Sequence, residues 1–167
     1  GWSKIAAWLN QDEQVNDYVV GPCTLLWRGT RDGFGANIFH SGCDNKTNTL
    51  TVIEATTGEI FGGFLGAAWI KGSNWTNCNR AFLFSITENL KLPVKAGTVG
   101  NAGYSNSGYG PTFGGNHDLK VGNNPNTSAS STMNIGHSYQ HPNGKTSFTS
   151  ASTFTVKEIE TFQVMTK

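Results

Sequence analysis

Four histidines and three cysteines are the side chains of this sequence most able to do chemistry. The histidines form no His-x-x-x-His pair on a predicted helix and the cysteines form no Cys-x-x-Cys pair, which are common zinc-ligand spacings. No Gly-x-Ser-x-Gly turn occurs that would present a nucleophilic serine. We therefore expect a protein that is not an enzyme and that holds no metal or cofactor.

The cysteines leave one chemical alternative open. Cys23, Cys43 and Cys78 are odd in number, so they can form at most one internal disulfide. An exposed Cys43 with a lowered pKa would be redox-reactive and would make the protein a weak peroxide scavenger. A buried, unreactive Cys43, or one bonded to Cys78, fits the pattern better.

Three aromatic residues are the best candidates for binding. Trp75, Tyr104 and Tyr109 lie in segments rich in Gly, Asn and Ser, which predicts exposed loops. A flat apolar ring beside amide groups suits stacking against a sugar or contact with a protein partner. Other aromatic residues must fill the core, and the sequence does not separate the two sets.

The polar segment Asn116-His117-Asp118 is a second candidate for binding. Together with Asn123 and Asn124 it offers oxygen atoms of the kind that bind calcium or the hydroxyl groups of a sugar. The alternative is a polar cap between a loop and a strand.

Three Asn-x-Ser/Thr triplets begin at Asn45, Asn74 and Asn126. They would accept glycans if the chain passed through a secretory pathway. Such triplets also arise by chance in a chain rich in Asn and Thr.

Length and charge limit the choice of partners. With 167 residues the chain is expected to form one domain over 1–167. The formal net charge is +1, with 12 basic and 11 acidic residues, which argues against nucleic acid or an anionic membrane as the partner. No apolar stretch reaches the roughly 18 to 20 residues of a membrane span.

The periodicity of apolar residues predicts the elements that carry these groups. An amphipathic helix is predicted over 2–10, and Asp32 is predicted to cap a second helix that buries Phe34, Ile38 and Phe39. Strands are expected over 23–28, 49–53, 59–65, 81–86 and 154–164, the last with an irregularity at Ile159. Residues 97–116 and 122–134 are expected to be surface loops.

Two motifs are expected to have a structural role rather than a role in binding. Arg31-Asp32 is expected to brace its turn, although a guanidinium there could also meet a partner carboxylate. Gly62-Gly63 predicts a bulge or a close backbone approach, and neither it nor Gly114-Gly115 has the spacing of a phosphate-binding loop. Short strands with few helices indicate an α+β fold, mainly β: a two-layer antiparallel β-sandwich with short flanking helices.

Six segments, taken in order, resemble the signature blocks of the TLDc domain family. They are Leu26–Phe34, Phe39–Cys43, Phe61–Phe64 followed by Trp69, Ala81–Ser85, Tyr109–Leu119 and Glu158–Val164. The resemblance spans residues 1–167. Its structural motif positions are Arg31, Asp32, Gly33, Gly62, Gly63, Gly114 and Glu158.

The resemblance implies a non-catalytic sandwich domain with a role in oxidative-stress resistance, exerted through binding of the vacuolar proton pump (V-ATPase). It implies a cytoplasmic location. The sequons and polar aromatic loops support a different reading, in which the chain is a secreted, lectin-like module that binds carbohydrate with or without calcium.

Overall fold

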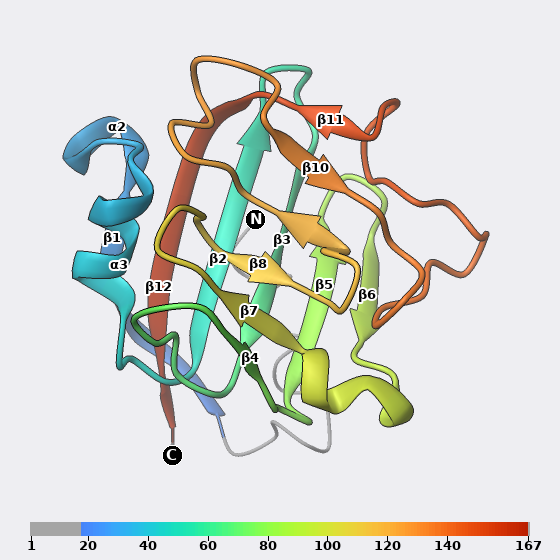
Figure 1. Ribbon diagram of the computed structural model, residues 1–167, viewed down its shortest axis with the longest axis horizontal. Helices are drawn as coiled ribbons and strands as arrows, with labels where there is room; N and C mark the ends of the chain where they lie inside the picture. The colour runs from blue at the N-terminus through green and yellow to red at the C-terminus, as the bar shows by residue number, and fades with distance from the viewer. Residues whose placement is uncertain (1–17, 167) are drawn as a thin grey trace.

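The computed structural model describes residues 18–166, and in this part of the chain two antiparallel sheets of six strands pack face to face (Figure 1). The predicted mainly β sandwich with short helices is confirmed. The helix predicted over 2–10 lies outside the described residues.

The first sheet is built from the longer strands. Its order is β1 (Tyr18–Arg28), β12 (Val156–Thr166), β2 (Thr49–Ala55), β3 (Ile60–Leu65), β5 (Ala81–Ser85) and β6 (Leu90–Pro93). The last strand therefore lies between the first two, so that both ends of the described chain are in one sheet. The pairing of β12 with β2 shifts register between Val156 and Glu158, which lets Val156 and Ile159 both reach the core. The predicted irregularity is confirmed.

The second sheet is built from very short strands. Its order is β11 (Thr153–Phe154), β10 (Ser131–Met133), β9 (Leu119–Lys120), β8 (Thr112–Phe113), β7 (Gly103–Ser105) and β4 (Asn74–Thr76). The prediction of surface loops over 97–116 and 122–134 was therefore wrong in part. These segments contain β7, β8, β10 and the 3₁₀ helix η1 (Ala96–Asn101), whose two to six residues are too short to show a period.

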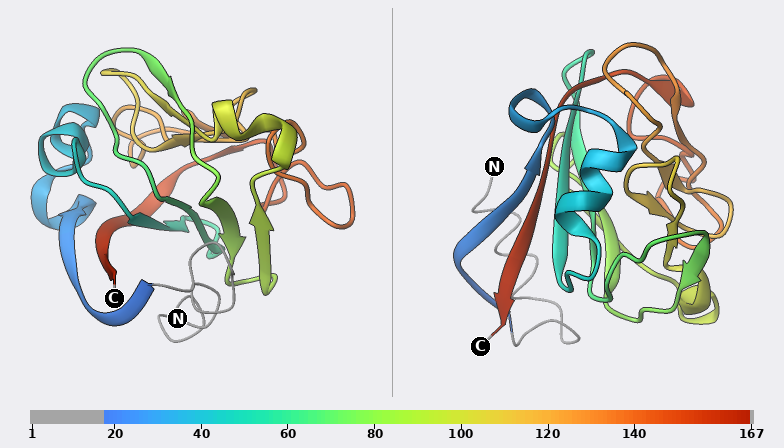
Figure 2. Two further views of the ribbon diagram at one scale, coloured as in Figure 1. Left: turned by 90° about the horizontal axis from the view of Figure 1, so that it is seen from below. Right: turned by 60° about the vertical axis from the view of Figure 1, so that its left-hand side comes forward.

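Two helices close one side of the sandwich. Figure 2 shows α2 (Gly29–Asp32) and α3 (Ala36–Cys43) beside the edge where β1 and β12 lie. The expectation that Asp32 caps the second helix was wrong. Gly35 is the N-cap residue of α3, and the first helical N–H, from Ala36, donates to Asn123 Oδ1 at 2.8 Å.

An aromatic column links these helices to the middle of the core. Phe39, from α3, packs against Trp27 with ring centroids 5.3 Å apart and against Trp69 at 5.6 Å. Trp69 then packs edge-on against Phe113 at 5.5 Å. Both indole N–H groups are satisfied: Trp27 donates to Gly33 O at 2.8 Å and Trp69 to Thr49 Oγ1 at 2.9 Å.

The paired glycines of β3 allow the two sheets to approach. β3 pairs with β2 and β5 without a register shift, so the predicted bulge is absent and the close approach is the correct alternative. A Cβ atom on Gly63 would lie 2.6 Å from the Phe113 ring, and one on Gly62 would lie 1.9 Å from Thr51 O. The neighbouring strand β5, predicted over 81–86, is buried along its whole length.

We expect Gly62→Ala to destabilise the protein by about 2 to 3 kcal/mol, because the backbone of β2 cannot move away from the added methyl group without breaking the ladder. Urea denaturation would measure the change. Gly97→Ala is the matched control, since a Cβ atom there meets nothing within 4 Å. Equal stability of the two variants would contradict this account of β3.

Candidate functional site

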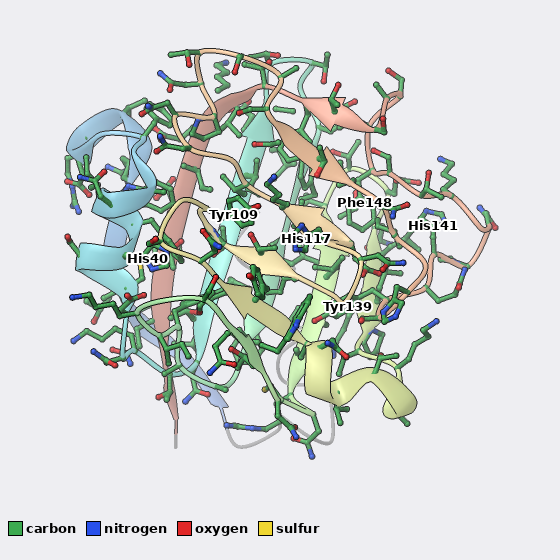
Figure 3. All side chains as sticks on the ribbon, viewed as in Figure 1. His40, Tyr109, His117, Tyr139, His141 and Phe148 are labelled. Atoms are coloured by element: carbon green, nitrogen blue, oxygen red, sulfur yellow. The ribbon has the colours of Figure 1, made fainter. Side chains whose placement is uncertain are left out.

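Five side chains gather on the outer face of the second sheet, from the strands β4, β7 and β9 and from the loops before and after β8. They are Trp75, Tyr104, Tyr109, His117 and Lys120, and we call them the aromatic platform. Trp75 and Tyr104 have ring centroids 4.5 Å apart, and Tyr104 stacks on His117 at 5.4 Å with an interplanar angle of 28°. Figure 3 shows Tyr109 and His117 on the face that carries β7 and β8.

The alternation of side chains along the strands produces this surface. Trp75 on β4 is the cross-strand partner of Tyr104 on β7. On the paired strands β8 and β9, Phe113 and Leu119 point into the core. The residue after Leu119, Lys120, therefore points outward. Trp75 is 40% exposed, and among residues 23–164 it is the one large apolar side chain that is exposed. The predicted placement of Trp75 and Tyr104 in loops was wrong, because both lie on strands.

His117 lies in the turn between β8 and β9, where its ring faces the platform and the next side chain, Asp118, faces the interior. His117 has φ 53°, and its backbone N–H closes the turn onto Gly114 O at 3.0 Å. Burial lowers the pKa of His117, and the charge of Lys120 lowers it further. The ring is therefore neutral at neutral pH and serves as another flat face of the platform. Asn116, beside it, is exposed.

A chain of hydrogen bonds fixes the rim of the platform. The Tyr104 hydroxyl lies 3.0 Å from Ser73 Oγ, which also accepts from Asn106 Nδ2 at 2.8 Å. The contacts with Ser73 and Asn106 lower the pKa of Tyr104. On the other side, Lys120 Nζ lies 4.2 Å from the centroid of the Tyr109 ring, a cation–π contact.

Asp118 points into the protein, away from the platform. Its Oδ2 accepts four backbone N–H bonds, from Gly136, His137, Ser138 and Tyr139, at 3.0 to 3.2 Å. The side chain is fully buried. The proposal that Asp118 supplies oxygen to a calcium or sugar site does not fit this placement, and the alternative of a polar cap does.

Gly114 packs closely against the Asp118 carboxylate and helps to bury it. Asp118 Oδ1 has no hydrogen-bond partner in the described part of the chain. A Cβ atom on Gly114 would lie 2.0 Å from it, and Gly114 also has φ 92°. Only glycine fits there, which gives the predicted structural position Gly114 its physical reason.

A pocket of about 350 Å³ lies next to the platform, between α3 and the segments around residues 71 and 107. His40 forms its wall. The Nε2–H of His40 donates to the carbonyl oxygens of Asn106 at 2.8 Å and Tyr109 at 2.9 Å, and Nδ1 lies 2.7 Å from Asp44 Oδ1. His40 thus ties α3 to the loop that carries Tyr109.

Three residues of the site were not predicted from the sequence: His40, Lys120 and Ser73. A signal for Lys120 was present, because the apolar residues Leu119 and Val121 on either side predict that it points outward. Contacts of His40 and Ser73 join residues 31 to 69 positions apart, which no local pattern reveals.

Cys43 and Cys78 are poorly placed for redox chemistry. Both are buried thiols, and the structure contains no bond between them. Cys43 is fully buried, and burial raises the pKa of its thiol to about 12.

The remaining buried histidine is also engaged. His141 Nδ1 accepts the backbone N–H of Asn143 at 3.0 Å, so Nε2 carries the proton and faces Glu88 Oε1 at 3.2 Å. Glu88 Oε1 also accepts from Lys145 Nζ at 3.0 Å. Among residues 18–166 no cluster of three His, Cys, Asp or Glu side chains could hold a metal ion.

The predicted motif positions Arg31, Asp32 and Glu158 brace α2. Hydrogen bonds from Arg31 and from the backbone N–H of Arg28 lower the pKa of Asp32 to about 2. Glu158 Oε1 accepts the backbone N–H of Thr30 at 3.1 Å, and Glu158 also accepts from the Thr30 hydroxyl. The third motif residue of the turn, Gly33, has φ 109°.

The three sequon asparagines, Asn45, Asn74 and Asn126, are all exposed. The helices of the described segment are too short and too polar to cross a membrane. Glycosylation itself stays a prediction.

A family model described as the TLDc domain matches residues 2–165 of the chain. A search among curated proteins gives no match. The matched range contains both sheets, the pocket and the whole aromatic platform.

We expect Asp118→Asn to lower the free energy of unfolding by about 2 kcal/mol. The substitution removes the charge that strengthens four hydrogen bonds and places an amide NH₂ group against Gly114. Thermal or urea denaturation measures the loss. Asn116→Ala, at the exposed position two residues away, should change stability by less than about 0.5 kcal/mol. A neutral Asp118→Asn would refute the structural role.

For Cys43 we expect no labelling by iodoacetamide in the folded protein at pH 7, where a thiol with a pKa of about 12 is ionised in roughly one molecule in 10⁵. In denaturant the same thiol should react fully. Peptide mass spectrometry distinguishes the two states. Rapid native labelling, or peroxide consumption that disappears in Cys43→Ser, would restore the redox alternative.

Proposed function

Because the chain belongs to the TLDc domain family, we propose that it is a non-catalytic binding domain and that the aromatic platform is its contact surface. The platform carries this proposal. It is the place in the described chain where a large apolar ring, that of Trp75, is exposed. Tyr104 and His117 pack against this ring, and Tyr109 packs against those two.

The state of the reactive side chains supports binding over catalysis. His40 and His141 have both ring nitrogens in contact with hydrogen-bonding partners, and the Cys43 thiol is buried. A general base or nucleophile needs a free atom facing its substrate. The platform offers flat faces, hydroxyls and one ammonium group, which suit recognition.

By family resemblance the expected partner is a protein assembly, a V-ATPase subunit, and the expected role is oxidative-stress resistance. The chemistry of the platform agrees with a protein contact, since Trp and Tyr are the residues that most often dominate the affinity of such interfaces. The rim hydrogen bonds hold Tyr104 in place before binding, which reduces the entropy lost on association.

Carbohydrate is the second candidate ligand, and one observation favours it. Rings of the platform alternate with hydroxyl and amide groups at its rim, notably Ser73 and Asn106. Sugars present an apolar face bordered by hydroxyl groups, so they complement this pattern. The exposed sequons fit a secreted glycoprotein of this kind.

We expect Trp75→Ala to weaken binding to isolated V-ATPase subunits at least tenfold, because this ring is the exposed large apolar side chain of the platform. Biolayer interferometry with immobilised subunits measures the affinity. Lys157→Ala is the control, since Lys157 is exposed on β12 of the other sheet. If wild type binds no subunit, the pump is not the partner; if Trp75→Ala binds as tightly as wild type, the platform is not the contact surface.

A further inference from the structure

The platform and the pocket beside it form one continuous surface. His40 lines the pocket and holds the carbonyl oxygens of Asn106 and Tyr109, the two ends of the short loop that borders the platform. On the opposite border, Gly72 lines the pocket and the next residue, Ser73, binds the Tyr104 hydroxyl. In the view of Figure 3, Tyr109 lies between His40 and His117.

The charges on this surface are unbalanced. Its two carboxylates are occupied: Asp44 by the His40 ring at 2.7 Å, and Asp118 by four backbone N–H groups in the interior. Lys71 lines the pocket, is exposed, and forms no ion pair with any residue in 18–166. Lys120 contacts the face of Tyr109 and no carboxylate of that range. Two ammonium groups are therefore available, one in the pocket and one on the platform.

We infer that this surface binds an acidic saccharide, with a sugar ring stacked on Trp75 and Tyr104 and carboxylates at Lys71 and Lys120. The inference rests on carbohydrate binding, the second of the functions proposed above, and names the class of sugar.

Each part of such a ligand has a counterpart in the site. The tilted pair of Trp75 and Tyr104 presents apolar faces for the C–H side of a pyranose ring. In the pocket, Asn37, Ser41 and Ser107 offer an amide and two hydroxyls to sugar hydroxyl groups. An ammonium group attracts a carboxylate as a point charge, and the two lysines provide one in the pocket and one over the Tyr109 ring. An acidic peptide shares the charge but lacks the ring faces.

The test compares two ligands that differ only in charge: a hexuronic acid trisaccharide and the methyl ester of the same trisaccharide. Isothermal titration calorimetry at pH 7 and low salt should give at least tenfold tighter binding of the acid, with an affinity that falls as salt is added. The double variant Lys71→Gln, Lys120→Gln should bind the acid as weakly as the ester and leave the ester unchanged. Lys157→Gln is the matched control on the other sheet.

The outcomes separate the inference from the function on which it rests. Equal binding of acid and ester, with both lost in Trp75→Ala, would leave carbohydrate binding standing and overturn the acidic class. Unchanged acid binding by the double lysine variant would overturn the assignment of the two lysines. If neither trisaccharide binds, both carbohydrate binding and the acidic class fail, while binding to V-ATPase subunits remains a separate measurement. Circular dichroism of each variant confirms that the exposed substitutions leave the fold intact.

Discussion

The buried carboxylate of Asp118 organises the second sheet. Strands of two or three residues make few ladder hydrogen bonds, so this sheet needs support from outside its own ladder. Asp118 Oδ2 supplies it by collecting four consecutive backbone N–H groups from residues 136–139. Tyr139, fixed in this way, donates its hydroxyl proton to Ala102 O at 2.7 Å, directly before β7. The carboxylate thus ties the β8–β9 turn to the segment after β10 and, through Tyr139, to β7.

The same turn determines the surface. His117, with φ 53°, lies in this turn directly before Asp118, and its ring stacks outward on Tyr104 while Asp118 is buried. The first sheet supports the platform from below. Gly63 of β3 leaves room for the Phe113 ring, and this buried ring anchors β8 beneath the platform. The aromatic column from Phe39 through Trp69 to Phe113 connects this point to α3. The platform is therefore supported by buried contacts on each side.

The sequence predicts the first sheet far better than the second. The hairpin of β2 and β3 and the buried strand β5 have five to seven residues each, long enough for apolar patterns to show. β7 and β8 lie among glycines and asparagines, and their pairing depends on contacts distant in sequence, so residues 97–116 are predicted as a loop. Asp32 has the right residue type for a helix cap, yet its carboxylate accepts the backbone N–H of Arg28, four residues earlier in the chain. Side-chain type alone did not distinguish these uses.

For the site, composition identified the aromatic residues and topology brought them together. Trp75, Tyr104, Tyr109 and His117 span more than forty positions, and only the antiparallel order of β4, β7, β8 and β9 places them on one face. Asp118 stands beside His117 in sequence but has the opposite role: in the turn between β8 and β9, Asp118 is buried and the His117 ring stacks on Tyr104. Asp118 Oδ2 and both ring nitrogens of His141 are already occupied by backbone and carboxylate partners. The capacity for new contacts therefore lies with the exposed rings and with Lys71 and Lys120, whose ammonium groups have no carboxylate partner in residues 18–166.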